Sequence, residues 1–205
     1  PMSAAVSTIH SLAFRTAGKR FAHRLNARRM RGDQAAQLLG LGPLKIGDGK
    51  NERLLGAGFL ASHVMKAMRR FCASADDEPG RQHVQYIDGI DMPDSGGRRT
   101  FVWNDAVKLH VQSALVKAWS DLSSTNGQLT FSHDVYLKLF AASRPRIPGD
   151  YVLVDEAQDQ TPVVTKMLEH QDAQIVLVGD SAQQIFEWRF ARDALQTMPN
   201  ARRLY

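Results

Sequence analysis

The sequence predicts an α/β fold built on a parallel sheet, and three observations in its last third support this. Residues 151–154 (YVLV) and 174–180 (QIVLVGD) each contain a short apolar run of strand length. Residues 161–171 between them predict a helix, with Thr161 at the N-cap and Pro162 at the first helical position. Two fully apolar strands joined by a helix are typical of a right-handed βαβ unit with buried strands.

The elements before this unit are predicted from apolar spacing and turn residues. Residues 3–8 are expected to form a short strand or its end, and a helix capped by Thr8 or Ser11 follows over residues 10–21. The other expected segments are a turn-rich break at 40–51, helices at 52–75, 104–122 and 132–142, and a loop at 76–103 that could hold a short hairpin. Residues 24–146 are therefore predicted as a mainly helical insertion between residues 1–23 and 147–205, two parts of one α/β domain.

The charge of the chain favours a polyanionic partner. The 205 residues carry a net charge of +5, and residues 1–32 hold seven Arg or Lys and no acid. This balance indicates nucleic acid first and an acidic membrane surface second, although a solvated helix face would explain the basic run equally well. A single cysteine, Cys72, excludes an internal disulfide and suits a reducing compartment. No apolar run approaches the roughly 18 residues of a membrane span.

Carboxylates gather where the two apolar strands end. Asp155 and Glu156 follow the first strand and Asp180 follows the second, and ligands of parallel sheets bind beyond the carboxyl ends of the strands. A strand-end Asp beside a Glu fits the Walker B pattern of P-loop NTPases, in which the Asp holds Mg²⁺ and the Glu deprotonates the water that attacks the γ-phosphate of ATP. The alternative is a loop of solvated acids.

The P-loop that would complete such a site is not found. The motif G-x-x-x-x-G-K-[ST] is matched only in part by residues 42–51 (GPLKIGDGKN), where Asp48 replaces the lysine after Gly47. No buried strand is predicted before this segment, so it is rejected. We expect the phosphate-binding loop upstream of Pro1, in a longer protein from which this chain is a piece, or not at all.

Aromatic residues cluster just after the second strand. Residues 183–190 (QQIFEWRF) place Phe186, Trp188, Arg189 and Phe190 within five positions. Aromatic faces stack on any nucleic-acid base, at about 1–3 kcal/mol per base, so sequence-tolerant binding needs only aromatics and a basic groove. The competing interpretation of the aromatic residues is that they pack into the core. For His10, the interpretation that competes with a DNA contact is a role as a helix cap or as a core residue.

These motifs resemble those of UvrD/Rep-type superfamily 1 helicases. Residues 154–159 (VDEAQD) and 178–191 (VGDSAQQIFEWRFA) are similar to motifs II and III of that family, and residues 7–15 (STIHSLAFR) to motif Ib. Residues 71–78, 132–140 and 179–185 look like the F-box DNA helicase branch and its bacterial relatives, although no F-box is visible. The resemblance implies part of a RecA-like P-loop NTPase lobe, with a helical insertion of the 1B type.

The resemblance also implies roles for single residues. Asp155 would bind Mg²⁺, Glu156 would be the catalytic base, Gln158 would couple the nucleotide and DNA sites, and Gln183 would sense the γ-phosphate. The expected DNA contacts are Thr8 and His10 on the single-stranded backbone and Phe186 and Trp188 on the bases, with Arg189 supporting these two aromatic residues. The family more often has Tyr at Phe186, and it usually has Gly where this chain has Phe190.

The expected function is therefore part of an ATP-dependent DNA helicase or translocase. It would use ATP and Mg²⁺ and act on single-stranded DNA and single-strand/double-strand junctions together with a second RecA-like lobe, and the family implies 3′ to 5′ movement in repair or recombination. The expected location is the cytoplasm or nucleoid of a bacterium, or the nucleus of a eukaryote. The alternatives are a P-loop ATPase that is not a helicase and a catalytically incomplete nucleic-acid-binding module.

Overall fold

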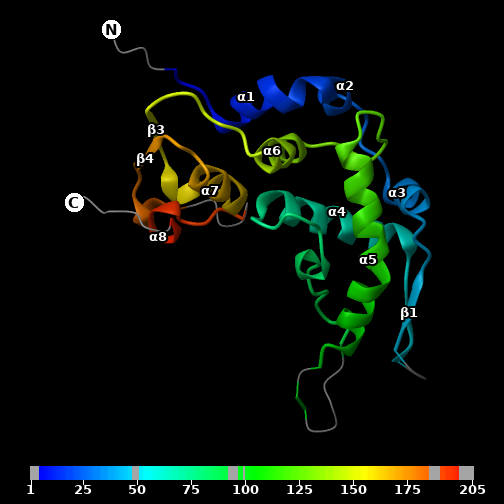
Figure 1. The fold of residues 1–205 in the computed structure, drawn as a ribbon. Coiled ribbons are helices and arrows are strands. Elements are labelled where there is room, and N and C mark those ends of the chain that lie inside the picture. Colours follow the sequence, from blue (N-terminus) through cyan, green and yellow to red (C-terminus); the bar gives the residue numbers. More distant parts are fainter. Residues whose placement is uncertain (1–4, 48–50, 92–96, 99, 185–189, 199–205) are drawn as a thin grey trace. The chain divides into compact units, whose positions relative to one another are not determined.

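The chain has a mixed α/β fold, described by a computed structural model for residues 5–47, 51–91, 97–98, 100–184 and 190–198 (Figure 1). It divides into two compact units. Unit 1 comprises Pro1–Leu25, Cys72–Asp77 and Ser132–Tyr205, and unit 2 comprises Asn26–Phe71 and Glu78–Phe131. The described residues contain no helix that is long and apolar enough to cross a membrane. The predicted bounds of the α/β domain and of its insertion stay a prediction.

The parallel sheet of unit 1 confirms the predicted βαβ pattern. Strands β3 (Tyr151–Val154) and β4 (Gln174–Leu177) pair in parallel, with Tyr151 opposite Gln174. Helix α7 (Pro162–Glu169) joins them and begins after Thr161 with proline at its first position, as predicted. The predicted burial of both strands is wrong. Tyr151 is 62% exposed and Leu153 is 72% exposed, because in the described part of the chain one face of this two-stranded sheet has no covering layer.

The N-terminal segment of unit 1 is helical from Ile9. Helix α1 (Ile9–Ala13) runs through a π-helical turn (Phe14–Gly18) and a 3-10 turn (Lys19–Phe21) into α2 (Ala22–Leu25). Residues 5–8 form no strand, because Thr8 is used as the N-cap and its Oγ1 accepts a hydrogen bond from the Ser11 backbone N–H at 3.1 Å. The segment packs against α6 (His133–Ala142), where Phe14 meets the edge of Tyr136.

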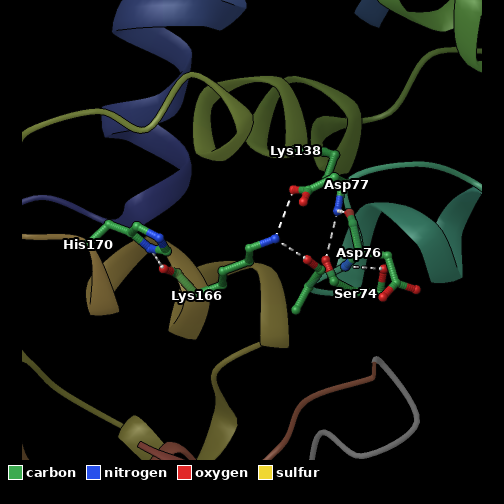
Figure 2. A network of polar contacts seen from close by, with 7 residues as sticks. Ser74, Asp76, Asp77, Lys138, Lys166 and His170 are labelled. Atoms are coloured by element: carbon green, nitrogen blue, oxygen red, sulfur yellow. Dashed lines mark hydrogen bonds and ion pairs between the residues drawn. The ribbon is translucent and has the colours of Figure 1, made fainter. Parts of the chain in front are cut away.

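A lysine network holds residues 74–77 within unit 1 (Figure 2). Lys138 of α6 is only 3% exposed, and its Nζ donates to the backbone oxygens of Ser74 at 2.8 Å and Asp76 at 2.5 Å. Lys166 of α7 donates to the Ala75 backbone oxygen and to Asp77 Oδ1, each at 2.8 Å. Two helices of unit 1 thus fix the loop that follows α4 (Ala57–Ala73).

Unit 2 is built on helices and one hairpin. Helix α5 (Val102–Ser123) buries Val107, Val111 and Leu115, and the other elements are α3 (Gly32–Leu39), the hairpin of β1 (Leu44–Ile46) and β2 (Arg53–Leu55), and most of α4. Several sequence predictions fail here. The predicted break at 40–51 contains β1, the predicted helix at 52–75 begins only at Ala57, and α3 was not foreseen. The described part of residues 76–103 contains no hairpin.

Candidate nucleotide and nucleic-acid site

The carboxylates predicted for the metal and the catalytic base stand exposed at the end of β3. Asp155 Oδ1 accepts a hydrogen bond from the Glu156 backbone N–H at 3.0 Å. Glu156 has φ 50 and ψ 47, in the left-handed region, which costs a non-glycine residue about 1–2 kcal/mol. Strain of this kind persists only where the surrounding structure enforces it, and it is concentrated at functional sites.

Gln158 joins the ends of the two strands. It is buried in the 3-10 turn Ala157–Asp159, where its Nε2 donates to Glu156 Oε2 at 2.5 Å and its Oε1 accepts from the Asp180 backbone N–H at 3.1 Å. The Ala157 N–H also donates to the Val178 carbonyl at 2.9 Å. One side chain therefore connects the predicted catalytic base directly to the segment after β4.

Gly179 leaves the room that Gln158 occupies. A Cβ at position 179 would stand 2.2 Å from Gln158 Oε1 and 3.0 Å from the Ala157 nitrogen. Because Gln158 is buried and bonded at both ends of its amide, it has little freedom to move aside. Glycine at this position is a packing requirement that no sequence motif indicates.

The segment after β4 is organised by Asp180. Its Oδ1 accepts from the Ala182 backbone N–H at 2.9 Å, and its Oδ2 accepts from Gln183 Nε2 at 2.9 Å. The backbone hydrogen bond from Ala182, followed by the one from Gln183, lowers the pKa of the Asp180 carboxyl below its ordinary value. The predicted γ-phosphate sensor thus rests on a carboxylate at the strand end, in an exposed position.

The donor set at the strand ends fits a nucleotide-bound Mg²⁺ better than an ion held by protein alone. In the described ranges, no group of three or more His, Cys, Asp or Glu side chains could hold a metal. Magnesium in nucleotide sites is usually bound through one or two carboxylates, with water and phosphate oxygens completing the octahedron. Asp155, exposed at the end of β3, supplies one such carboxylate.

Thr8 and His10, which are predicted to contact the DNA backbone, lie at the start of α1. Thr8 Oγ1 caps the helix and donates to Ser11 Oγ at 2.9 Å. His10 Nε2 lies 3.8 Å from Asp134 Oδ1 of α6, and its ring stands edge-on to Tyr136 with centroids 6.3 Å apart. Within the described residues, these contacts of Thr8 and His10 are with Ser11, Asp134 and Tyr136, and none of them is with the strand-end carboxylates.

The predicted base contacts Phe186 and Trp188 and the supporting Arg189 lie outside the described residues. The chain that follows them is attached to the carboxylate loop, because the Arg192 backbone N–H donates to the Gln160 oxygen at 2.8 Å. Helix α8 (Ala194–Thr197) packs on the 3-10 turn of Gln158. Phe190 has φ 69, a conformation that favours glycine. Both flanks of the aromatic segment therefore contact the loop of Glu156, an arrangement that the sequence did not reveal.

Comparison with known proteins confirms the resemblance to UvrD/Rep-type helicases. Residues 119–201 match the UvrD/REP helicase N-terminal domain. F-box DNA helicase 1 of Gallus gallus is 28% identical over 212 residues, which cover all of this chain and 20% of that protein. F-box DNA helicase protein 1 of Schizosaccharomyces pombe is 32% identical over 142 residues, which cover 66% of this chain and 15% of that protein. The chain thus spans a fifth or less of these relatives, and no solved structure matches it.

Proposed function

We propose that this chain, which resembles UvrD-like helicases, is the part of an ATP-dependent DNA helicase that carries the catalytic carboxylates and one face of the DNA site. The observation that carries the proposal is the bridge of Gln158, which bonds Glu156 on one side and the backbone of Asp180 on the other. In this proposal residues 1–23 and 147–205 belong to a RecA-like lobe and residues 24–146 to a 1B-like insertion. The cell compartment would follow from action on DNA: nucleoid or nucleus.

The chemistry would take place at the carboxyl ends of β3 and β4. Asp155 would hold Mg²⁺, which neutralises phosphate charge when Mg-ATP is bound. Glu156 would accept the proton of the attacking water. Its left-handed backbone and its bond to Gln158 set the direction of the carboxylate before any substrate arrives. Such preorganisation holds the base in the orientation that proton transfer requires.

Coupling to DNA would run through Gln158 and Gln183. Gln183 Nε2 is held by Asp180 Oδ2 here, so sensing a γ-phosphate requires it to exchange this partner. That exchange would alter the turn Ser181–Gln183, which leads directly into the segment containing Phe186, Trp188 and Arg189. Thr8 and His10 would provide backbone contacts from α1. The polarity of 3′ to 5′, action at single-strand/double-strand junctions, and a role in repair or recombination are inferred from the family resemblance alone.

The test is ATP hydrolysis by the full-length protein with and without single-stranded DNA. DNA should stimulate hydrolysis, and Glu156→Gln should lower kcat by about 10²- to 10⁴-fold while ATP and DNA still bind. Glu169→Gln, which removes an exposed carboxylate of α7, is the matched control and should leave kcat unchanged. The 205 residues alone, which contain no P-loop motif, should show negligible turnover.

Two outcomes would redirect the assignment. If DNA does not stimulate hydrolysis, a P-loop ATPase of another kind explains the carboxylates and the segment 186–189 becomes core. If the full-length protein binds DNA but never hydrolyses ATP, the chain is a catalytically incomplete nucleic-acid-binding module. The net charge of +5 is compatible with that second candidate.

A further inference from the structure

An exposed aromatic pair lies on unit 2, and neither of its residues has been assigned a role so far. The ring centroids of Tyr86 and Phe101 are 4.9 Å apart, with the planes tilted by 41°. Tyr86 is 50% exposed and Phe101 is 42% exposed, and Lys108 Nζ lies 3.8 Å from the centroid of the Tyr86 ring. Large aromatic side chains are usually drawn into a core, and a group of them at the surface marks a binding site more often than a single one does.

The pair is presented by a firmly held loop. Asn104, buried in the first turn of α5, accepts from the Ile87 N–H at 2.6 Å and donates to the Ile87 oxygen at 3.2 Å. It also donates to Asp91 Oδ2, and Asp91 Oδ1 accepts from the Trp103 N–H at 2.7 Å. The loop of Tyr86 is therefore fixed to the helix start beside Phe101. A platform that is rigid before binding loses less entropy when a ligand arrives.

The charge of unit 2 is suited to a polyanion. Unit 2 contains fourteen Arg and Lys against nine Asp and Glu, whereas unit 1 contains twelve of each, so the whole net charge of +5 belongs to unit 2. Beside the pair, Arg53 Nη1 donates to the Gly89 oxygen at 2.7 Å, which brings a second cation to the loop of Tyr86. The exposed acids of the same elements are Asp88 and Asp105, so the local excess of cations is small.

We propose that Tyr86 and Phe101, with Lys108 and Arg53 beside them, form a second contact for single-stranded nucleic acid. An unpaired base would stack on the exposed aromatic surface, and the two cations would lie near the adjoining phosphates. Aromatic faces with only a small excess of positive charge favour a strand with unpaired bases over a duplex, whose bases are hidden. The inference rests on the proposed function for the nature of the strand, but it requires no ATP hydrolysis.

The experiment measures binding of the full-length protein to a labelled oligo-dT by fluorescence anisotropy. Tyr86→Ala with Phe101→Ala should weaken binding by about tenfold, within the range known for stacked bases, whereas Tyr86→Phe should keep wild-type affinity. Leu109→Ala is the matched control, because Leu109 is an apolar residue of α5 that is even more exposed than the pair, at 63%, and its loss should have no effect. Lys108→Ala should reduce the slope of log affinity against log salt by about 0.7.

An abasic oligonucleotide of the same length separates stacking from charge. Wild type and the double variant should bind it equally, because no base remains to stack. Equal losses on both oligonucleotides would overturn the stacking role. Unchanged oligo-dT binding by the double variant, beside a loss for Trp188→Ala, would overturn this inference and leave the proposed function standing. If the double variant of Tyr86 and Phe101 binds oligo-dT normally but no longer binds a protein partner of the wild type, the aromatic pair belongs to a protein interface. If the wild type does not bind DNA, both proposals fail.

Discussion

Replacing Lys138 by methionine should destabilise unit 1 markedly, although the substitution adds apolar character to a buried position. The ammonium makes two hydrogen bonds to backbone oxygens, those of Ser74 and Asp76. Hydrogen bonds to a charged group contribute about 1.5–3 kcal/mol each, so about 3–6 kcal/mol of favourable interaction is lost. Part of this lost free energy is offset, because the methionine side chain carries no charge that must be desolvated on folding. We expect a net loss of about 2 kcal/mol in the free energy of unfolding.

The matched control is Lys166→Met, because Lys166 holds the same loop by two hydrogen bonds of its own (Figure 2). Its side chain is 33% exposed and its partner Asp77 is 79% exposed, so water screens this ion pair and Lys166→Met should destabilise unit 1 less than Lys138→Met does. Urea unfolding followed by circular dichroism measures both variants. For a chain of this length, 2 kcal/mol corresponds to about 4–8 °C in Tm. Equal stability of the two variants would refute the reasoning.

The pH dependence gives an independent readout of the same ammonium. Burial lowers the pKa of Lys138 from 10.5 to about 8. Between pH 8 and 10.5 the unfolded chain therefore binds more protons at this group than the folded chain, so its contribution makes stability rise with pH. The difference in stability between wild type and Lys138→Met should widen in favour of wild type across that window, by at most about 1.4 kcal/mol per pH unit. A constant difference would show that the ammonium is not desolvated.

Three further predictions concern single positions. Phe190→Gly should be about 1 kcal/mol more stable than Phe190→Ala in urea unfolding, because φ 69 strains alanine but not glycine; equal stabilities would contradict this. Gly179→Ala should lower kcat of the DNA-stimulated ATPase at least tenfold, because the added methyl group displaces Gln158. Adding Gln158→Ala to this variant should lower kcat little further. Additive losses in kcat would show that the two residues act separately. Burial raises the pKa of the Cys72 thiol from 9.0 to about 12. Between pH 9 and 12 the folded chain therefore keeps a proton that the unfolded chain loses, so the free energy of unfolding falls as pH rises. Cys72→Ala should remove this fall in stability.

The sequence predicted those parts of the fold in which local chemistry and tertiary structure agree. The pair β3 and β4 was recognisable because apolar runs of strand length flank a helix that opens with Pro162. Burial of Tyr151 was mispredicted because the pattern assumed a covering layer that the described chain does not supply. The hairpin of β1 and β2 escaped notice because its strands are three residues long and lie among glycines, so pairing rather than periodicity defines it.

The candidate site was predictable in its residue types but not in its connections. Strand-end acids point to a metal and nucleotide site, yet nothing in the order of residues says that the Gln158 amide bonds both Glu156 and Asp180. Lys138 carries a signal that could have been used, since a lone lysine within the apolar run VYLKLF predicts a cation buried against backbone oxygens. The Tyr86 and Phe101 pair is separated by fifteen positions and becomes visible only in three dimensions.

The uncovered face of β3 and β4 has a practical consequence for work with the isolated polypeptide. The exposed apolar surface here is formed by Tyr151, Leu153 and Val178. In the described chain each strand pairs with a neighbour along only one of its two edges. Unpaired strand edges next to apolar surface are templates for intermolecular pairing. Purified at high concentration, the 205 residues should therefore form soluble aggregates and then precipitate, and replacing Leu153 by lysine should raise the concentration at which light scattering first increases.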